Sequence, residues 1–249
     1  MGRQLRRNTV KWGAAAIATF TAYSLPVNAQ QVPSDDFTTF TQWCENKERI
    51  SPEARHTVEV LLEEVDTQDC AIASEKLTNL TDLSLGYNEI TDINPLSPLT
   101  NLIHLGLYGN EITNISPLSP LTSLIHLGLG DNEITDISPL SSLTSLTTLN
   151  LYGNEITDIS PLSPLTSLTY LGLGDNEIID IGSLSPLTHL TALNLYGNEI
   201  TDISPLSSLT SLILLRLIDN EITDISPLSP LTNLTHLWLN GNEITDRRE

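Results

Sequence analysis

The 249-residue sequence is poor in positive charge, in aromatic side chains and in cysteine. It has 11 Lys and Arg residues against 31 Asp and Glu, and between residues 77 and 246 the only Lys or Arg is Arg216. Phosphate groups are bound by clustered Lys and Arg, so nucleic acid and anionic membrane surfaces are excluded as predicted partners. A cationic partner, or one indifferent to charge, is compatible with this composition.

The sequence also lacks the motifs that carry catalysis. It contains no serine nucleophile elbow, no phosphate-binding loop and no H-E-x-x-H zinc motif. It contains neither an EF-hand loop nor the glycine-rich nonapeptide of calcium-binding solenoids. We therefore predict a protein that is not an enzyme and that uses no metal ion or cofactor.

Long apolar runs are missing as well. The one notable apolar stretch lies within residues 1–29, whose pattern is typical of an export signal. Four cations fall within residues 3–11, small apolar residues cover 12–25, and a small-x-small cleavage site precedes Gln30. Cleavage leaves seven cations against 31 acids, a formal charge of −24. We predict a secreted, periplasmic or cell-surface protein with no membrane span after signal removal; an uncleaved N-terminal anchor is the alternative.

The only two cysteines, Cys44 and Cys70, lie between this signal and the repeated part of the chain. In an exported chain an even pair predicts a disulfide. Closing a loop of this length contributes about 3 kcal/mol in the chain-entropy model. A metal site is disfavoured, because the two cysteines are far apart and no ligand set surrounds them.

Residues 30–76 differ in composition from the rest and predict a helical N-terminal cap. One amphipathic helix is expected after the capping pair at 34–35, and a second is opened by Ser51-Pro52. Such a helical pair, tied by the disulfide, would cover the apolar end of the repeat stack.

What the sequence has in abundance is repetition. Eight 22-residue copies of L-T-x-L-x-x-L-x-L-x-x-N-E-I-T-D-I-S-P-L-S-P cover residues 77–246, and 247–249 form a short tail. A fixed period of this length predicts a solenoid. Within each copy the L-x-L segment alternates and predicts a short parallel strand, whereas the Pro-rich segment predicts a 3₁₀ turn or an extended segment on the opposite side. The predicted fold class is α/β, a solenoid with its parallel sheet on the concave face and a small helical cap.

One asparagine follows each predicted strand at a tight turn. Its amide can bond the backbone of adjacent coils and satisfy donors and acceptors that the turn would otherwise leave buried. We predict a structural asparagine ladder made of Asn88, Asn110, Asn132, Asn154, Asn176, Asn198, Asn220 and Asn242.

These repeats resemble the leucine-rich repeats, and the 22-residue form with N-x-I-x-D-I-x-P-L resembles the internalin-type repeats of bacterial surface proteins. The resemblance implies a curved, right-handed solenoid that binds proteins. Three features depart from internalins: a disulfide-tied cap, no immunoglobulin-like segment after the repeats and no cell-wall sorting motif. The layout is closer to secreted leucine-rich repeat proteins of cyanobacteria or other Gram-negative bacteria, so a role in host-cell invasion is not implied.

Side chains that point outward from the predicted strands form columns on the concave face, with neighbours about 4.8 Å apart. One column runs Asp82, His104, His126, Thr148, Tyr170, Ala192, Leu214 and His236. The next runs Ser84, Gly106, Gly128, Asn150, Gly172, Asn194, Arg216 and Trp238, and a third begins at Gly86 and Tyr108. Every aromatic residue of the repeats lies on or beside this face, and none replaces a core Leu or Ile.

Tyr and Trp are enriched at binding hot spots because they contribute a large contact area at a modest entropic cost. We predict a ligand-binding site made of Tyr108, Tyr152, Tyr170, Tyr196, Arg216, Trp238, His104, His126 and His236. Tandem duplication explains why Tyr108, Tyr152 and Tyr196 are 44 residues apart, but it does not explain why all the aromatic residues share one face.

Two groups of residues in this region have metal-ligand chemistry. Asp82, His104 and His126 are consecutive in one column, but a flat column converges poorly on a zinc ion. The repeated Glu and Asp that follow each asparagine are expected to be solvated and to cap turns rather than to bind Ca²⁺. The predicted function is therefore binding of a protein partner through the concave face. A polysaccharide ligand and end-to-end self-association are the alternatives.

Overall fold

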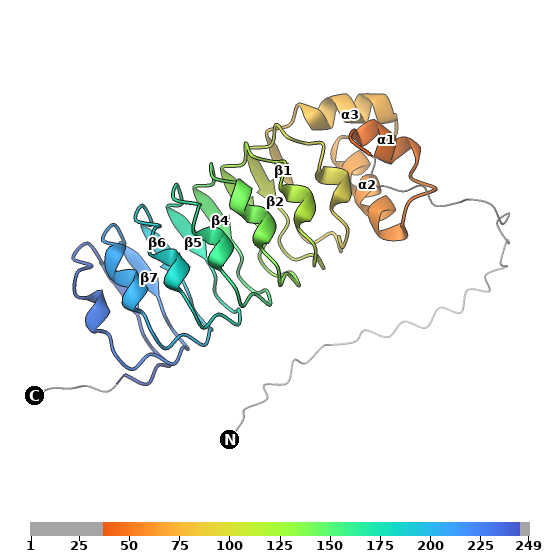
Figure 1. The fold of residues 1–249 in the computed structure, drawn as a ribbon. Helices are drawn as coiled ribbons and strands as arrows, with labels where there is room; N and C mark the ends of the chain where they lie inside the picture. Colours follow the sequence, from red (N-terminus) through yellow and green to blue (C-terminus); the bar gives the residue numbers. More distant parts are fainter. Residues whose placement is uncertain (1–36, 245–249) are drawn as a thin grey trace, which may run out of the picture. The chain divides into compact units, whose positions relative to one another are not determined.

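A computed structural model describes residues 37–244 of the chain (Figure 1). The predicted signal peptide at 1–29, the predicted capping pair at 34–35 and the tail at 247–249 lie outside these residues. Three α-helices come first in the described part, and strands alternating with short 3₁₀ helices follow. The helices are α1 (Phe40–Glu45), α2 (Pro52–Glu64) and α3 (Cys70–Thr78).

Eight strands form one parallel sheet in chain order, as the repeats predict. They are β1 (Asp82–Ser84), β2 (His104–Gly106), β3 (His126–Gly128), β4 (Thr148–Asn150), β5 (Tyr170–Gly172), β6 (Ala192–Asn194), β7 (Leu214–Arg216) and β8 (His236–Trp238). Each residue pairs with the residue 22 positions later, for example Asp82 with His104. The strand register therefore confirms the first two predicted columns, whereas the third, which begins at Gly86 and Tyr108, lies beyond the strands.

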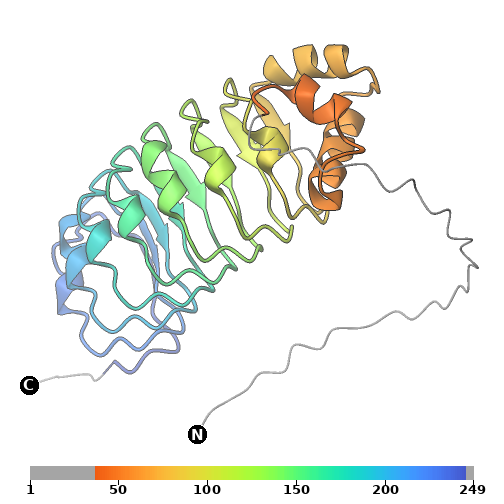
Figure 2. The ribbon, with the colours of Figure 1, turned by 45° about the vertical axis from the view of Figure 1, so that its right-hand side comes forward.

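The 3₁₀ helices lie on the opposite side of the coils from the sheet (Figures 1 and 2). They are η2 (Asn94–Leu96), η3 (Ser116–Leu118), η4 (Ser138–Ser142), η5 (Ser160–Leu162), η6 (Gly182–Leu184), η7 (Ser204–Ser208) and η8 (Ser226–Leu228). An Asp two residues earlier holds the start of these turns, except at η3, where Asn114 takes its place. Asp158, for instance, accepts the Ser160 N–H at 2.8 Å and the Ser160 hydroxyl at 3.0 Å. This confirms that the repeated Asp caps turns.

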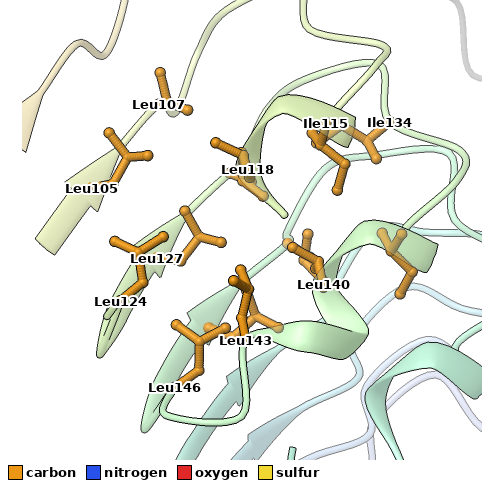
Figure 3. Packing of buried hydrophobic residues seen from close by; sticks show 14 of the residues in the cluster. Leu105, Leu107, Ile115, Leu118, Leu124, Leu127, Ile134, Leu140, Leu143 and Leu146 are labelled. Carbon is orange, nitrogen blue, oxygen red and sulfur yellow. The ribbon is translucent and has the colours of Figure 1, made fainter. Parts of the chain in front are cut away.

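The core is the inside of the coils, where Leu and Ile from the strand side meet those from the 3₁₀ side. Figure 3 shows Leu105 and Leu107 of one coil lying near Leu118 of the same coil and Leu127 of the next. All four side chains are essentially inaccessible to solvent. Each buried Leu or Ile contributes about 1.5–3 kcal/mol, so the stack is stabilised by many nearly equal increments.

The asparagine ladder is present. Asn132, Asn154, Asn176, Asn198 and Asn220 each donate to a carbonyl of their own coil and to a carbonyl of the preceding coil, and each accepts an Ile N–H from that preceding coil. Asn110 makes the same set of bonds to the first coil. Asn88 differs because helices, not a coil, precede it. Its side-chain amide donates to the Gly86 carbonyl, and its backbone N–H donates to the side-chain oxygen of Asn110.

The N-terminal cap contains three helices where the sequence predicted a pair. The missed helix, α3, runs to Thr78 and so crosses the predicted boundary at residue 76. Asp69 caps it by accepting hydrogen bonds from the Ala71 and Ile72 N–H groups. The first helix begins at Phe40, where Thr39 and Gln42 form a capping box.

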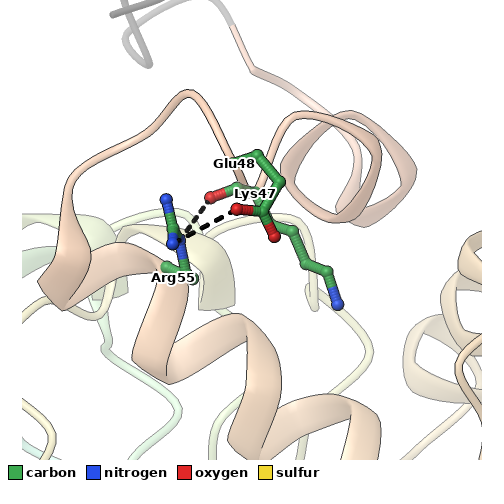
Figure 4. Close-up of polar contacts among 3 residues, drawn as sticks. All are labelled: Lys47, Glu48 and Arg55. Carbon is green, nitrogen blue, oxygen red and sulfur yellow. Dashed lines mark hydrogen bonds and ion pairs between the residues drawn. The ribbon is translucent and has the colours of Figure 1, made fainter. Parts of the chain in front are cut away.

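The cap is joined internally and to the first coil. The Cys44–Cys70 disulfide links α1 to the start of α3, as predicted. Arg55 of α2 donates to the Lys47 carbonyl at 2.8 Å and pairs with Glu48 at 3.3 Å, which fixes the loop between α1 and α2 (Figure 4). His56 and Thr57 of α2 contact backbone carbonyls of the first coil, both at 2.6 Å. The apolar end of the stack is therefore covered at its N-terminal side.

The residue before each ladder asparagine has a positive φ and alternates between glycine and a larger residue. Asp131, Asp175 and Asp219 have φ of 54°, 48° and 52°, and Gly153 and Gly197 have φ of 67° and 66°. A Cβ built on Gly197 would meet the Asp175 carboxylate of the preceding coil. The side chain of the larger residue in one coil therefore requires glycine at the same position of the next coil. This gives a structural reason for the 44-residue spacing of the repeated residues at this position.

Replacing Gly197 with alanine is expected to lower the free energy of unfolding by about 1–2 kcal/mol, because a Cβ is strained at positive φ and displaces the Asp175 side chain. Urea unfolding followed by circular dichroism measures the loss. Gly128→Ala is the matched control, since its Cβ would meet nothing closer than 3.9 Å and its φ is not in the left-handed region. Equal losses in the two variants would contradict this explanation.

Candidate functional site

We call the side chains that point outward from β1–β8 the strand face; it corresponds to the predicted concave face. Strands β1–β7 bury their central Leu and turn their first and third residues outward, as in β2, where His104 is exposed and Leu105 is buried. In β8 the central Leu237 is 40% exposed. All the predicted site residues lie on or beside this face. The structure brings five of them into two groups, His104 and His126 in a groove over β1–β4 and Arg216, His236 and Trp238 over β7–β8. The four predicted tyrosines lie outside both groups.

A shallow groove of about 490 Å³ lies on the strand face over β1–β4. Its polar lining comes from Asp82, Ser84, His104, His126, Thr148 and Asn150 of the sheet and from Glu64 at the end of α2. Neither Lys nor Arg is among its lining residues. The groove therefore combines histidine and carboxylate groups of the sheet with a carboxylate of the cap.

Glycine hollows the sheet here. Gly106 and Gly128 follow each other in the second column, where Asn, Arg or Trp stand in other coils. A Cβ on Gly128 would meet only backbone atoms at 3.9 and 4.0 Å, so the space above this residue is open. At β5 the hollow ends, because Asn150 and the Tyr170 hydroxyl lie over Gly172, within 2.7 and 3.2 Å of where its Cβ would stand.

Asp82, His104 and His126 make a continuous polar row along one side of the groove. Asp82 accepts a hydrogen bond from the Thr81 hydroxyl at 2.7 Å and pairs with His104. The Thr81 hydroxyl, and more weakly His104, hold the pKa of the Asp82 carboxyl below its usual value, so this exposed carboxylate is ionised at neutral pH. The His104 and His126 rings stack with centroids 4.6 Å apart.

Side chains in a column point in parallel rather than toward one point, so this row converges poorly on a metal ion. Within residues 37–244 no group of three or more His, Cys, Asp or Glu side chains is arranged to hold a metal ion.

The predicted aromatic residues differ in their exposure to solvent and in their contacts within the protein. Tyr87 and Tyr108 pack edge to face with centroids 5.2 Å apart, and they are 73% and 41% exposed. Tyr152 is half-buried, and its hydroxyl donates to Asp175 of the next coil at 2.7 Å. Tyr170 is exposed, and Tyr196 is half-buried. Their roles in binding stay predictions, and Tyr152 already has a partner within the protein.

The hydrogen bond to Asp175, with partial burial, raises the pKa of Tyr152 from 10.0 to about 12. Because the folded state holds this proton more tightly than the unfolded state, the bond stabilises the fold below pH 10.0 and its contribution is lost as pH rises toward about 12. An ultraviolet titration should therefore show a late tyrosine that is missing in Tyr152→Phe. The control Tyr170→Phe should keep it; if Tyr152→Phe also keeps it, the assignment is wrong.

A second cluster lies over β7 and β8. The Arg216 guanidinium stands 4.9 Å from the centroid of the Trp238 ring, and the His236 ring stacks on the same indole at 5.7 Å. In the described residues Arg216 forms no ion pair, although the protein is strongly acidic. These three predicted site residues are therefore brought together into one patch, with a cation held against an aromatic face.

The sequence argument missed two parts of the groove. Glu64 was placed in the cap and given no role, because nothing in the local sequence indicates that α2 ends beside β1. The hollow above Gly106 and Gly128 was predictable, since two consecutive glycines in an outward column leave the sheet bare. That signal was present in the second column and was not used.

The comparisons with known proteins agree with this architecture. The family model described as Leucine Rich repeats (2 copies) matches residues 78–120, 122–164, 166–208 and 210–247, well over half of the chain. The chain belongs to the leucine-rich repeat family. Searching curated protein sequences gives no match.

Several solved leucine-rich repeat structures are similar to this one. Internalin C2 from Listeria monocytogenes is 34% identical, with a TM-score of 0.71 over 76% of this chain and 85% of that one. Internalin inlF from the same species is also 34% identical, with a TM-score of 0.57 over 77% of this chain and 70% of that one. These two structures support the predicted internalin-like character of the repeats.

The third is the ectodomain of the plant receptor kinase GASSHO1/SCHENGEN3 from Arabidopsis thaliana, solved in complex with CASPARIAN STRIP INTEGRITY FACTOR 2. It is 29% identical with a TM-score of 0.58, and the match covers 68% of this leucine-rich repeat protein but 22% of the receptor chain. The leucine-rich repeat fold is typically a scaffold for protein interactions. None of the helices in residues 37–244 is long and apolar enough to cross a membrane.

Proposed function

We propose that this leucine-rich repeat protein is an exported, non-catalytic binding module that takes a protein partner on its strand face. The observation that carries the proposal is the strand face itself. It gathers the exposed Tyr170, the Arg216–Trp238–His236 patch and a groove on one side of the stack. Aromatic residues and arginine are the side chains most enriched among binding hot spots.

Three further points support this proposal. The leucine-rich repeat fold is typical of protein-binding modules, and the plant receptor ectodomain was solved in complex with CASPARIAN STRIP INTEGRITY FACTOR 2. The opposite side of the coils presents mainly Ser, Thr, Asp and Pro, which offer little apolar area for a hot spot. Export is proposed from the pattern of residues 1–29 and from the disulfide, since disulfides persist in oxidising compartments.

The test is capture of partners by the immobilised protein from the source organism's surface and secreted fractions, with proteins and polysaccharides assayed separately. Once a partner is identified, Trp238→Ala is expected to weaken its binding by about 2 kcal/mol, roughly 30-fold in Kd. Ile179→Ala is the matched control, because Ile179 is 59% exposed and lies away from the strands. If Trp238→Ala binds as tightly as Ile179→Ala, Trp238 is not part of the site.

Other outcomes of the same capture distinguish the alternatives. A purified polysaccharide retained by the protein and lost in a Tyr170→Ala, Trp238→Ala variant would favour a glycan ligand. The second candidate function is end-to-end association, which is favoured by the exposure of Ile225 in the seventh coil and Leu237 in the eighth, 39% and 40%. Capture of the protein's own copies, unaffected by that variant, would favour it over the strand-face proposal.

A further inference from the structure

The groove over β1–β4 has the size and shape to receive one side chain of a partner together with a short stretch of its backbone. Its volume of about 490 Å³ is within the usual range of ligand pockets, roughly 300–1,000 Å³. It is bounded at β5 by Asn150 and Tyr170, and Glu64 of α2 lines it beside β1. A side chain that enters it would therefore lie along the sheet, across successive strands.

The floor of the groove is apolar and bare. Gly128 has only backbone atoms near the place where a Cβ would stand, whereas the Ser84 hydroxyl and the edge of the Tyr108 ring lie beside Gly106, 3.5 Å from that place. The buried Leu105 and Leu127 lie between the columns. Such a floor suits the methylene stem of a long side chain, which gains from leaving water while its charged end stays near polar groups.

The polar groups of the groove are acceptors and flat rings. Two carboxylates, Asp82 and Glu64, lie at the end where the sheet meets the cap, and Asp82 is held ionised by its hydrogen bonds. The stacked imidazoles of His104 and His126 form a planar wall beside them. Neither Lys nor Arg lines the groove, and His104 is the only lining residue paired with either carboxylate among the described residues. The whole protein carries a large negative charge that attracts positive groups.

We infer that this groove receives an arginine or lysine side chain from the partner protein, with its charged end between Glu64 and Asp82. This inference rests on the proposed function and names the partner chemistry of one half of the strand face. Arginine fits best, because its planar guanidinium bonds two carboxylates at once and stacks on flat rings. The stem of that side chain lies over Gly106 and Gly128.

The first test uses small probes and needs no identified partner. N-acetyl-arginine methylamide is titrated into the isotope-labelled protein, and backbone amide resonances of Gly106 and Gly128 are followed by nuclear magnetic resonance. We expect saturable shifts at these glycines and at His104 and His126, with roughly millimolar affinity for so small a ligand. The citrulline analogue has nearly the same shape without the charge, so it should shift these resonances little.

Two variants assign the effect to the groove. Glu64→Gln with Asp82→Asn removes both carboxylates and is expected to weaken the arginine probe about tenfold. Its matched control, Glu177→Gln with Glu221→Gln, removes the same charge from exposed residues of distant coils and should change affinity little. A difference between the two pairs separates direct contact from the general attraction of an acidic protein.

Gly128→Gln tests the shape of the groove separately from its charge. The space above Gly128 is open and Asn, Arg and Trp occupy the same column elsewhere, so this variant should fold normally while filling the groove. We expect it to abolish the shifts at Gly106, His104 and His126 with an unchanged circular dichroism spectrum.

The inference is overturned if the arginine probe causes no shift at the groove, if citrulline shifts the same resonances equally, or if both pairs of acid substitutions weaken binding equally. None of these results touches the proposed function, which fails only if captured partners ignore the strand face altogether. A partner that depends on Trp238 but not on Glu64, Asp82 or Gly128 would keep the proposed function and reject the arginine groove.

Discussion

Replacing Asn154 with alanine is expected to lower the free energy of unfolding by about 3 kcal/mol or more, since each buried polar group left without a partner costs about 1–3 kcal/mol. The Asn154 amide donates to the Leu129 and Leu151 carbonyls, both at 3.0 Å, and its oxygen accepts the Ile134 N–H at 3.0 Å. The side chain is only 7% exposed, so water cannot take over these bonds. The substitution therefore weakens one coil and the coil before it.

Urea unfolding followed by circular dichroism gives the loss for Asn154→Ala. Two asparagines serve as controls. Asn101→Ala removes an exposed side chain with a single bond to Thr78 and should cost less than about 1 kcal/mol. Asn242 is half-buried in the last described coil, and its amide donates to two carbonyls of the ladder. For Asn242→Ala we expect a loss of stability between those of the other two variants. If Asn154→Ala and Asn101→Ala cost the same, the ladder is not a main source of stability.

Removing the disulfide is expected to cause the other large decrease in the free energy of unfolding. Cys44 and Cys70 are 26 residues apart in sequence, and cross-linking a loop of this length stabilises the folded state by about 3 kcal/mol in the chain-entropy model. The bond joins α1 to the start of α3, and Phe40 and Trp43 of α1 are buried beside it. A Cys44→Ala, Cys70→Ala variant should therefore lose the packing of α1 before it loses the coils.

Hydrogen exchange measures where that loss falls. We expect amide protection to drop in α1, α3 and the first coil while the central coils keep theirs, because each coil of a solenoid contacts only its neighbours. The single variant Cys70→Ala should behave as the double variant does, since one cysteine cannot form the bond. An unchanged thermal midpoint after loss of the bond would contradict a stabilising role.

The repeated part of the fold follows from local sequence. The L-x-L alternation, the asparagine and the Ser-Pro segment recur every 22 residues, and a strict period leaves stacking in register as the way to bury every Leu. The strand register, the first two columns, the turn-capping Asp and the ladder from Asn110 onward were predicted on that basis, and the structure confirms them. The pairing of Cys44 with Cys70 was predicted because no third cysteine exists.

The cap was predicted less well, because it has no repeat. Its second helix was recognised from Ser51 and its apolar spacing, and Ser51 caps α2 as expected. Helix α3 was missed, although Asp69 provides an N-cap, because its buried positions are few: Ala73 and Leu77. A short helix with two buried residues has no clear apolar period, and its stability comes from contacts with α1 that sequence spacing does not show.

For the candidate site, the sequence alone determined which side chains share the strand face, because that depends only on the period and on the alternation of a strand. The tertiary structure decided what they do to one another. It turned the Tyr152 hydroxyl onto Asp175, set Arg216 over Trp238, and brought Glu64 of the cap to the glycine hollow of the first coils. The physical reason is that periodicity, a local property of the sequence, fixes only the direction of each side chain. Hydrogen bonds, ring stacking and grooves depend instead on where neighbouring coils and the cap place their atoms.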